Sequence, residues 1–328
     1  MKISRIVIVM ALSVAMVFGF SACRSDDSSE SPKKTVYQFH STVTYLATGT
    51  DGSAGTGATY CYFGDWPQTI KAANVTVDEK NNITMGSRVY YLGSDNNYYA
   101  KCRERTYADS TYSDGTMVKA SGDTDPGSLS EKYFKVEPIK WRVLNPNASG
   151  NKILFAENIL TALLYDNDSS NYKESTIRKY LGSDFLDTAF TTVAQRLIAL
   201  TVLDNSEEST NPADNPCQWN SGKNDYICIT TSDKIFLLSE KEVTTTDYGF
   251  IAYSQSNPEN KRGERIKETT DYAIANYAGA GSWWTRSPSS DVRSEVHYIK
   301  NDGSADACMS ITRDYVGIVP ALSISAGN

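Results

Sequence analysis

The chain has 328 residues, of which 40% are hydrophobic and 22% charged, so it can bury a large core and cannot be disordered throughout. Its 32 basic residues are outnumbered by 39 acidic ones, and the formal charge of -7 argues against binding to nucleic acid. The 21 tyrosines favour a recognition function, because tyrosine supplies contact area at low entropic cost.

The first 22 residues are typical of a secretory signal peptide. They begin with Lys2 and Arg5, continue through an apolar run from Ile6 to Phe20, and end in small residues before Cys23. The run is shorter than the roughly 20 apolar residues of a membrane-spanning helix. Small residues before a cysteine resemble the lipobox of bacterial lipoproteins, which implies that cleavage leaves Cys23 as a lipidated N-terminus. An ordinary cleaved signal is the alternative, since Phe20 replaces the usual aliphatic residue.

Residues 23–34 are expected to be the lipidated cysteine and a flexible tether, because no aliphatic or aromatic side chain follows Cys23 in this range. Without Lys2 and Arg5, 30 basic residues remain against 39 acidic ones, a formal charge of -9. An acidic surface is not attracted to anionic headgroups, so we expect membrane contact through the lipid anchor only. These features predict a lipoprotein of the cell envelope, at the outer membrane or the cell surface.

The cysteines beyond Cys23 are odd in number, so at least one is unpaired or pairs outside the chain. They are Cys61, Cys102, Cys217, Cys228 and Cys308. Their spacing leaves the pairs 61–102 and 217–228 open. No interval is C-x-x-C and the chain has only 2 histidines, so the sequence predicts no metal site.

Segments with strand character dominate the first part of the folded region. Aromatic and β-branched residues with partial alternation predict strands over 35–40, 59–63, 87–92, 97–102 and 139–144. Residues 110–130 are poor in apolar side chains, and we expect a surface insertion around residues 72–135.

Helical signals follow in the middle of the chain. Short helices are predicted over 175–181, with Gly182 closing it, over 184–190, over 196–200 behind a capping box from Thr192 to Gln195, and over 240–243. Strands are predicted over 226–230, 234–238, 282–285 and 316–324, with a hairpin over 296–304. The order of these elements predicts one mixed α+β domain over residues 35–328.

Six phrases in the chain form an ordered set. They are FGDWPQT at 63–69, EPIKWRVL at 137–144, STIRKYL at 175–181, DKIFLLSE at 233–240, WWTRSP at 283–288 and GIVPAL at 317–322. Together they resemble a bacterial lipoprotein family of unknown function that is frequent in spirochaetes and gut firmicutes. The last two phrases, with the polar stretch between them, are similar to C-type-lectin-like domains of the formylglycine-generating-enzyme kind. This resemblance implies a lectin-like α+β fold with a ligand face near the C-terminus.

The resemblance implies neither catalysis nor a cofactor. Formylglycine-generating enzymes use a closely spaced cysteine pair near the C-terminus, where Cys308 stands alone here. The Glu-Pro-Asn and Trp-Asn-Asp phrases of calcium-dependent lectins do not occur either. The chain also has no G-x-S-x-G, H-E-x-x-H, Walker or dinucleotide-binding motif, so we expect binding without turnover.

Polar and aromatic side chains concentrate between residues 289 and 315, where two strands and their turns can display them. We expect the ligand contacts to come from Arg293, His297, Tyr298, Asp306, Arg313 and Tyr315. The alternative is a solvated polar hairpin without a ligand. Trp283 and Trp284 face opposite sides of a strand, so at least one is expected in the core, and Arg286 is expected to brace the following turn by bonding carbonyls.

These observations predict a lipid-anchored surface lipoprotein that binds a glycan, or a host or cell-surface protein, without catalysis. A structural or assembly lipoprotein of the cell envelope is the second interpretation. A glycoside-active enzyme is the third, because the two carboxylates of a glycosidase need not be close in sequence.

Overall fold

The computed structural model describes residues 37–47, 58–122, 125–147, 149–210, 230–252, 264–289, 292–305 and 307–325. One compact unit extends over residues 36–328. Within the described ranges, no helix is both long enough and apolar enough to cross a membrane. Strands dominate and the helices are short, so the mixed α+β class is confirmed in broad outline.

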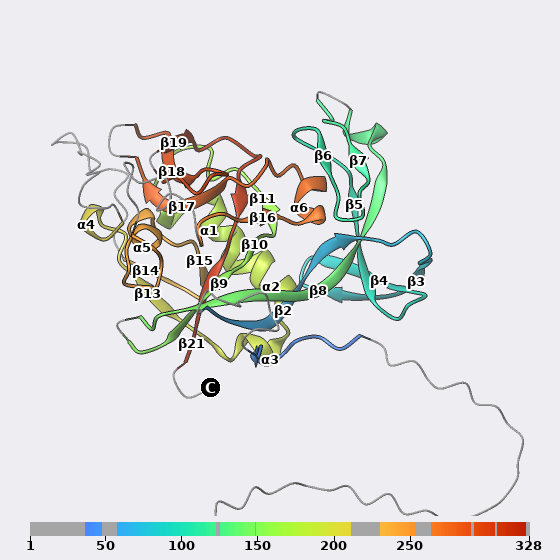
Figure 1. The fold of residues 1–328 in the computed structure, drawn as a ribbon, viewed down its shortest axis with the longest axis horizontal. Coiled ribbons are helices and arrows are strands. Elements are labelled where there is room, and N and C mark those ends of the chain that lie inside the picture. The colour runs from blue at the N-terminus through green and yellow to red at the C-terminus, as the bar shows by residue number, and fades with distance from the viewer. Residues whose placement is uncertain are drawn as a thin grey trace, which may run out of the picture. The chain divides into compact units, whose positions relative to one another are not determined.

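Two long strands organise the main sheet (Figure 1). β2 (Thr59–Ile70) and β8 (Glu131–Leu144) pair antiparallel over nearly their whole length. The other edge of β8 pairs first with β5 (Tyr98–Arg103) and then with β9 (Lys152–Ala156). β8 therefore joins the two halves of the sheet, to which the described residues contribute 10 strands.

The remaining strands of this sheet are β1 (Thr44–Tyr45), β3 (Val77–Met85), β4 (Arg88–Gly93), β12 (Ile198–Ala199), β15 (Ile235–Phe236) and β21 (Ala321–Ile324). The segment expected as a surface insertion, 72–135, contributes β3, β4 and β5 to the sheet beside β8. It also contains the pair β6 (Ser110–Thr111) and β7 (Met117–Val118) and the short helix η1 (Pro126–Ser128).

A second sheet carries the C-terminal segment. Its strands are, in order, β11 (Thr161–Ala162), β20 (Gly317–Ile318), β17 (Trp283–Pro288), β18 (Glu295–Ile299) and β19 (Ala307–Ser310). β18 and β19 are antiparallel, so the hairpin predicted over 296–304 is confirmed and extends to residue 310. Two small pairs complete the strands, β10 (Asn158–Ile159) with β16 (Glu268–Thr269) and β13 (Thr201–Leu203) with β14 (Thr231–Asp233).

The helices of the described ranges are one or two turns long. Besides η1, they are η2 (Tyr172–Glu174), α1 (Thr176–Tyr180), η3 (Leu181–Phe185), α2 (Leu186–Ala189), α3 (Thr192–Gln195), α4 (Glu207–Thr210), α5 (Glu240–Thr244) and α6 (Asp271–Ala275). α1 continues through η3 into α2, so Gly182 does not end the first helix as predicted. The helix predicted over 196–200 is also wrong, because Thr191 caps the single turn of α3 and Ile198 then pairs with Ile324 in the main sheet. The strand predicted over 226–230 lies outside the described residues, apart from residue 230.

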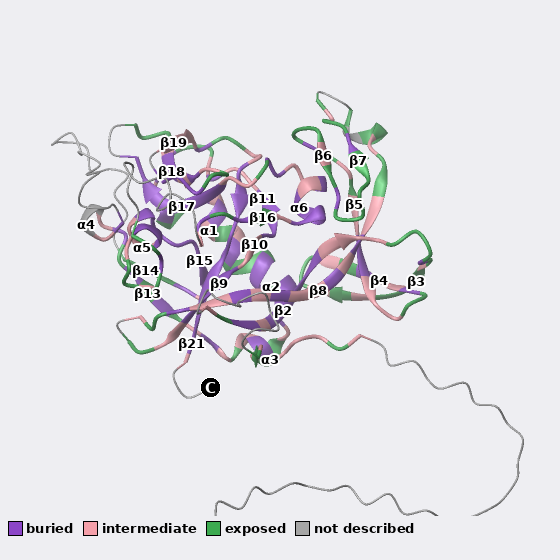
Figure 2. Cartoon of the chain, viewed as in Figure 1, coloured by how far each residue is buried: buried purple, intermediate pink, exposed green. Residues whose placement is uncertain are grey.

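Buried residues follow the central strands of both sheets (Figure 2). The largest buried side chains include Trp66, Trp141, Trp283 and Trp284. The indole N–H of Trp66 donates to the carbonyl of Leu160 over 2.9 Å, and that of Trp284 donates to the carbonyl of Leu163 over 3.0 Å. Trp283 and Trp284 are both fully buried, which confirms the prediction that at least one of them belongs to the core.

One buried carboxylate holds the segment that precedes β1. Asp65 accepts hydrogen bonds from the Tyr37 hydroxyl and, over 2.7 Å, from the backbone N–H of His40. The Nδ1 atom of His40 also lies 2.7 Å from Asp65 Oδ1. These contacts hold residues 37–40 in an irregular conformation, so the strand predicted over 35–40 is wrong for the residues that the structure describes.

Candidate recognition surface

The residues predicted to contact a ligand do not share one surface. Arg293 lies before β18, and its Nη2 atom is 3.5 Å from Oδ2 of Asp168, with side chains 54% and 85% exposed. Such a solvent-exposed pair contributes little to stability, so Arg293 remains accessible to a partner. Asp306 and the lipidation residue Cys23 lie outside the described residues.

His297 is buried, which corrects the prediction that it contacts a ligand. Only 3% of the residue is exposed, and its Nδ1 atom lies 2.7 Å from Oε2 of Glu240, which is 1% exposed. Glu240 is the first residue of α5, and α5 packs against β18. The imidazole therefore faces the covering helix and not the solvent.

Tyr298 is half-buried. It pairs with Trp284 on one side and with Ala307 on the other, and its ring packs against the hydrophobic core. Its contribution to a ligand surface is limited to the part of the ring that the core leaves uncovered.

Tyr315 belongs to an aromatic cluster at the surface. Its ring stacks on that of Tyr107, with centroids 3.9 Å apart and planes inclined by 20°. Tyr277 meets Tyr107 edge-on at 5.5 Å. We call Tyr107, Tyr277 and Tyr315 the tyrosine cluster. Tyr107 is 40% exposed, so the cluster presents an aromatic side chain to solvent.

Charged side chains border the tyrosine cluster. The guanidinium of Arg105 lies over the Tyr277 ring at 3.6 Å from its centroid, and Arg105 Nη1 is 3.3 Å from Asp314 Oδ2. Arg313 is exposed next to Asp314. Burial and the neighbouring Tyr107 raise the pKa of the Tyr315 phenol, while the positive charge of Arg313 lowers it. The phenol therefore stays protonated at physiological pH, and its hydroxyl donates to Sδ of Met309 over 3.3 Å.

The backbone brings these distant segments together at some conformational cost. Tyr277 has a φ of 73°, a conformation that non-glycine residues rarely adopt. A hydrogen bond of 2.8 Å from its N–H to the carbonyl of Arg105 holds it there. Gly279 packs below the cluster, where a Cβ atom would lie 3.3 Å from Cδ2 of Tyr315. Close packing at this position thus favours the smallest residue.

Arg105, Tyr107 and Tyr277 were not among the predicted site residues. Arg105 and Tyr107 lie far from the C-terminal strands in sequence, Tyr277 lies six residues before β17, and only the high tyrosine content of the chain pointed towards them. Among the described residues, no three His, Cys, Asp or Glu side chains are placed to hold a metal ion. Cys61, Cys102 and Cys308 are free thiols, so the pair 61–102 does not form, while Cys217 and Cys228 lie outside the described residues.

A comparison with known protein families assigns the second half of the chain to a family. The model described as Domain of unknown function (DUF6273) matches residues 149–326, which is more than half of the chain. The chain belongs to the DUF6273 family. No curated protein and no solved structure matches it. The description of DUF6273 names no reaction.

The tyrosine cluster crosses the boundary of the DUF6273 match. Tyr277 and Tyr315 lie within residues 149–326, whereas Arg105 and Tyr107 precede them. The candidate surface is therefore built by the DUF6273 region together with the connection between β5 and β6, which precedes it.

Proposed function

We propose that this DUF6273 protein is a lipid-anchored lipoprotein of the cell surface that binds a macromolecular ligand without catalysis, through the tyrosine cluster and its charged border. The stacked pair of Tyr107 and Tyr315 carries the proposal. Of the two ligand classes expected from the sequence, a protein is favoured over a glycan. Tyrosine and arginine are enriched at protein interfaces, and a polar rim of paired charges commonly surrounds them.

The anchoring part of the proposal is supported by the sequence around Cys23. Its signal-like run ends in small residues before the cysteine, and a tether over residues 24–34, as expected from their polar composition, would give the folded unit reach from a membrane. We also propose a lectin-like fold, which is supported by the order of the C-terminal phrases. WWTRSP on β17 and GIVPAL across β20 and β21 frame the polar segment between them.

A binding screen of the chain from residue 24 onward, across arrays of host-matrix proteins and glycans, tests this proposal. We expect a protein hit that weakens at least tenfold in the triple variant Tyr107→Ala, Arg313→Ala, Tyr315→Ala, because these residues supply the exposed contact. The control is Tyr45→Ala, which removes a tyrosine of similar exposure, 43%, from β1. Unchanged binding by the triple variant, with an unchanged melting temperature, would overturn the assignment.

A further inference from the structure

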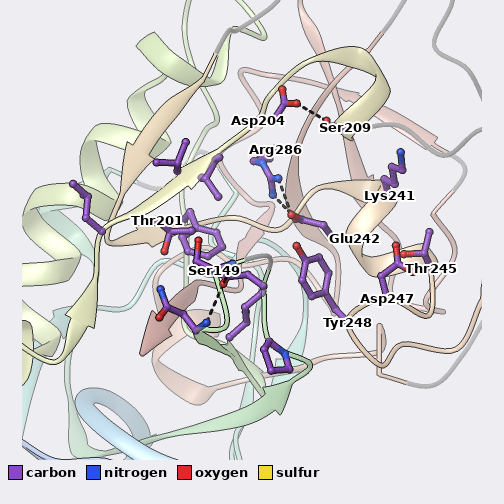
Figure 3. Close-up of a pocket in the computed structure, with 18 residues that line it drawn as sticks. Ser149, Thr201, Asp204, Ser209, Lys241, Glu242, Thr245, Asp247, Tyr248 and Arg286 are labelled. Atoms are coloured by element: carbon purple, nitrogen blue, oxygen red, sulfur yellow. Dashed lines mark hydrogen bonds and ion pairs between the residues drawn. The ribbon is translucent and has the colours of Figure 1, made fainter. Parts of the chain in front are cut away.

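A polar pocket of about 510 Å³ opens between α5, strand β13 and the segment that joins β8 to β9. Its volume falls within the roughly 300–1,000 Å³ of ordinary small-ligand sites. Figure 3 shows the side chains that line it, among them Glu242, Tyr248 and Arg286. None of the residues of the tyrosine cluster lines this pocket.

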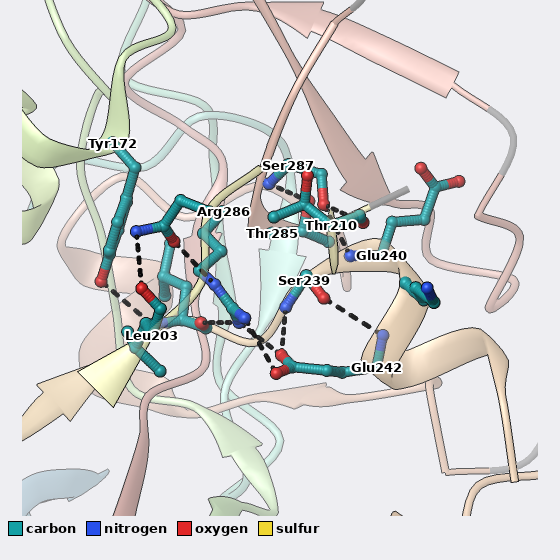
Figure 4. Close-up of polar contacts among 12 residues, drawn as sticks. Tyr172, Leu203, Thr210, Ser239, Glu240, Glu242, Thr285, Arg286 and Ser287 are labelled. Atoms are coloured by element: carbon teal, nitrogen blue, oxygen red, sulfur yellow. Dashed lines mark hydrogen bonds and ion pairs between the residues drawn. The ribbon is translucent and has the colours of Figure 1, made fainter. Parts of the chain in front are cut away.

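Arg286 and Glu242 form the floor of the pocket. Arg286 is only 2% exposed, and its guanidinium meets the Glu242 carboxylate in a two-pronged ion pair. The Nη2 atom of Arg286 donates to Oε1 of Glu242 over 2.8 Å, and Nη1 donates to Oε2. Arg286 also bonds the carbonyl of Leu237 over 3.0 Å and Asn205 Oδ1 over 3.1 Å (Figure 4). Arg286 thus bonds a backbone carbonyl, but that carbonyl belongs to Leu237, and no described bond reaches the turn that Arg286 was predicted to brace.

The ion pair leaves one donor and one acceptor side by side. A guanidinium has five N–H bonds, and four of those on Arg286 have acceptors among the described residues, so one Nη2–H remains. Glu242 Oε2 also accepts the backbone N–H of Ser239 over 2.7 Å, whereas Oε1 accepts only from Arg286 within the described part of the chain. One hydroxyl group of a ligand can accept a hydrogen bond from Arg286 Nη2, while an adjacent hydroxyl of the same ligand donates to Glu242 Oε1.

The same contacts fix this floor before any ligand arrives. Ser239 and Glu242 form a capping box at the start of α5, in which the Ser239 hydroxyl accepts the N–H of Glu242 over 3.2 Å. The carboxylate is thus held by the helix cap and by the guanidinium together. A ligand would not have to immobilise either side chain, which favours binding.

Tyr248 adds a third polar group on the wall of the pocket. Its hydroxyl is turned towards Glu242 (Figure 3), and no described residue accepts a hydrogen bond from it. Burial, with the Glu242 carboxylate next, raises the pKa of Tyr248 to about 12. The phenol is therefore protonated at neutral pH and able to donate to a ligand oxygen.

The charges in the pocket favour a neutral ligand. The charge of Arg286 is already neutralised by Glu242. The other charged residues that line the pocket are two acids, Asp204 and Asp247, and one base, Lys241, so the lining disfavours an anionic ligand. Val202 adds an apolar wall, since 68% of this side chain is exposed beside the polar groups. A ligand that suits all of these features carries adjacent hydroxyl groups on an otherwise apolar ring.

We propose that the pocket binds one or two neutral sugar rings, with two adjacent hydroxyls on Glu242 Oε1 and Arg286 Nη2 and a third oxygen on the Tyr248 hydroxyl. This site is separate from the surface proposed for macromolecular binding. Either assignment can hold without the other.

Ligand-observed NMR with the full mature chain tests the proposal. The probes are glucose, galactose, mannose, N-acetylglucosamine and lactose, with glucuronate and N-acetylneuraminate as charged counterparts. We expect at least one neutral sugar to bind, and both acids to bind more weakly than that sugar. Tyr248→Phe keeps the ring and removes the hydroxyl, so it should weaken binding about three- to tenfold.

Two further variants make the outcome decisive. Tyr107→Ala, in the tyrosine cluster, should leave sugar affinity unchanged, and Tyr248→Phe should leave binding in the protein-array screen unchanged. Glu242→Gln should abolish sugar binding, with circular dichroism as the check on folding. The proposal is overturned if every neutral sugar is silent, if acids bind more tightly than neutral sugars, or if folded Tyr248→Phe binds as the parent does.

Discussion

The Nδ1 atom of His297 and the Oε2 atom of Glu240 lie 2.7 Å apart, with both side chains buried between β18 and α5. A carboxylate in such a place needs a close partner, because desolvation of an unpaired charge is costly. The polar character of His297 therefore serves to dock a helix onto the second sheet.

His297→Ala should lower the free energy of unfolding by about 3 kcal/mol, because it removes the imidazole that lies 2.7 Å from the buried Glu240 carboxylate. Arg293→Ala, at the exposed position four residues earlier, should change it by less than about 0.5 kcal/mol. Urea denaturation of both variants measures the difference. Equal effects would show that His297 does not secure α5.

Gly64 should resist substitution more than other glycines of similar backbone conformation. Its φ is 68°, and a Cβ atom there would lie 2.5 Å from Cε1 of Phe190 and 2.8 Å from the carbonyl of Ala189. Gly115 has a φ of 87° with nothing within 4 Å. Gly64→Ala should therefore cost about 2 kcal/mol more than Gly115→Ala, measured by thermal or urea unfolding. Similar losses in the two variants would contradict the steric argument.

Lys267 should make stability depend on pH. Burial lowers the pKa of its ammonium to about 8, although Glu157, 3.2 Å away, opposes the shift. Between this value and the pKa of the unfolded chain near 10.5, the unfolded state binds more protons, so the Lys267 contribution favours folding increasingly as pH rises. Below pH 8 the lysine is charged in both states and the full cost of burying it is present.

Comparison with Lys267→Met isolates this effect. From pH 8 to 9.5 the unfolding free energy of the parent should rise by about 1.5 kcal/mol relative to the variant. The comparison is needed because burial raises the pKa of Cys61 to about 12, which destabilises the folded state over the same range in both proteins. Parallel curves would show that Lys267 is not buried as a cation.

Asp65→Asn should release the segment that precedes β1. The substitution removes the charge that receives the Tyr37 hydroxyl and the His40 N–H, so residues 37–45 should exchange their amide hydrogens at least tenfold faster. Hydrogen exchange followed by mass spectrometry measures this locally. Tyr37→Phe, which removes one of these bonds, should produce a smaller increase. Unchanged protection in Asp65→Asn would contradict the role of the carboxylate.

Local patterns predicted much of the secondary structure. The helix over 240–243 and the strands at 87–92 and 97–102 appear close to their expected ranges, as α5, β4 and β5. Each depends on nearby residues, such as the cap of α5 by Ser239. The failures occur where distant groups decide the conformation, as in residues 37–40, which bond to Asp65, or Ile198, which pairs with Ile324.

The candidate sites depend still more on distant contacts. Alternation along β18 predicted that the side chain of His297 points outward from the strand, but it gave no indication that α5 would cover it. The stack of Tyr107 on Tyr315 and the pairing of Glu242 with Arg286, 44 residues apart, join segments that no local pattern relates. The tyrosine content of the chain favoured a recognition function, but only the fold showed which tyrosine rings lie in contact.

The DUF6273 match begins at residue 149, in the connection between β8 and β9, and thus divides the main sheet. A protein shortened to the matched range would leave the β9 edge that pairs with Val143 and Leu144 without a neighbour, and the carbonyl of Leu160 without the indole of Trp66. Unpaired strand edges promote aggregation. We therefore expect the family range alone to be insoluble, and soluble expression of this region to require β2 and β8 in the same polypeptide.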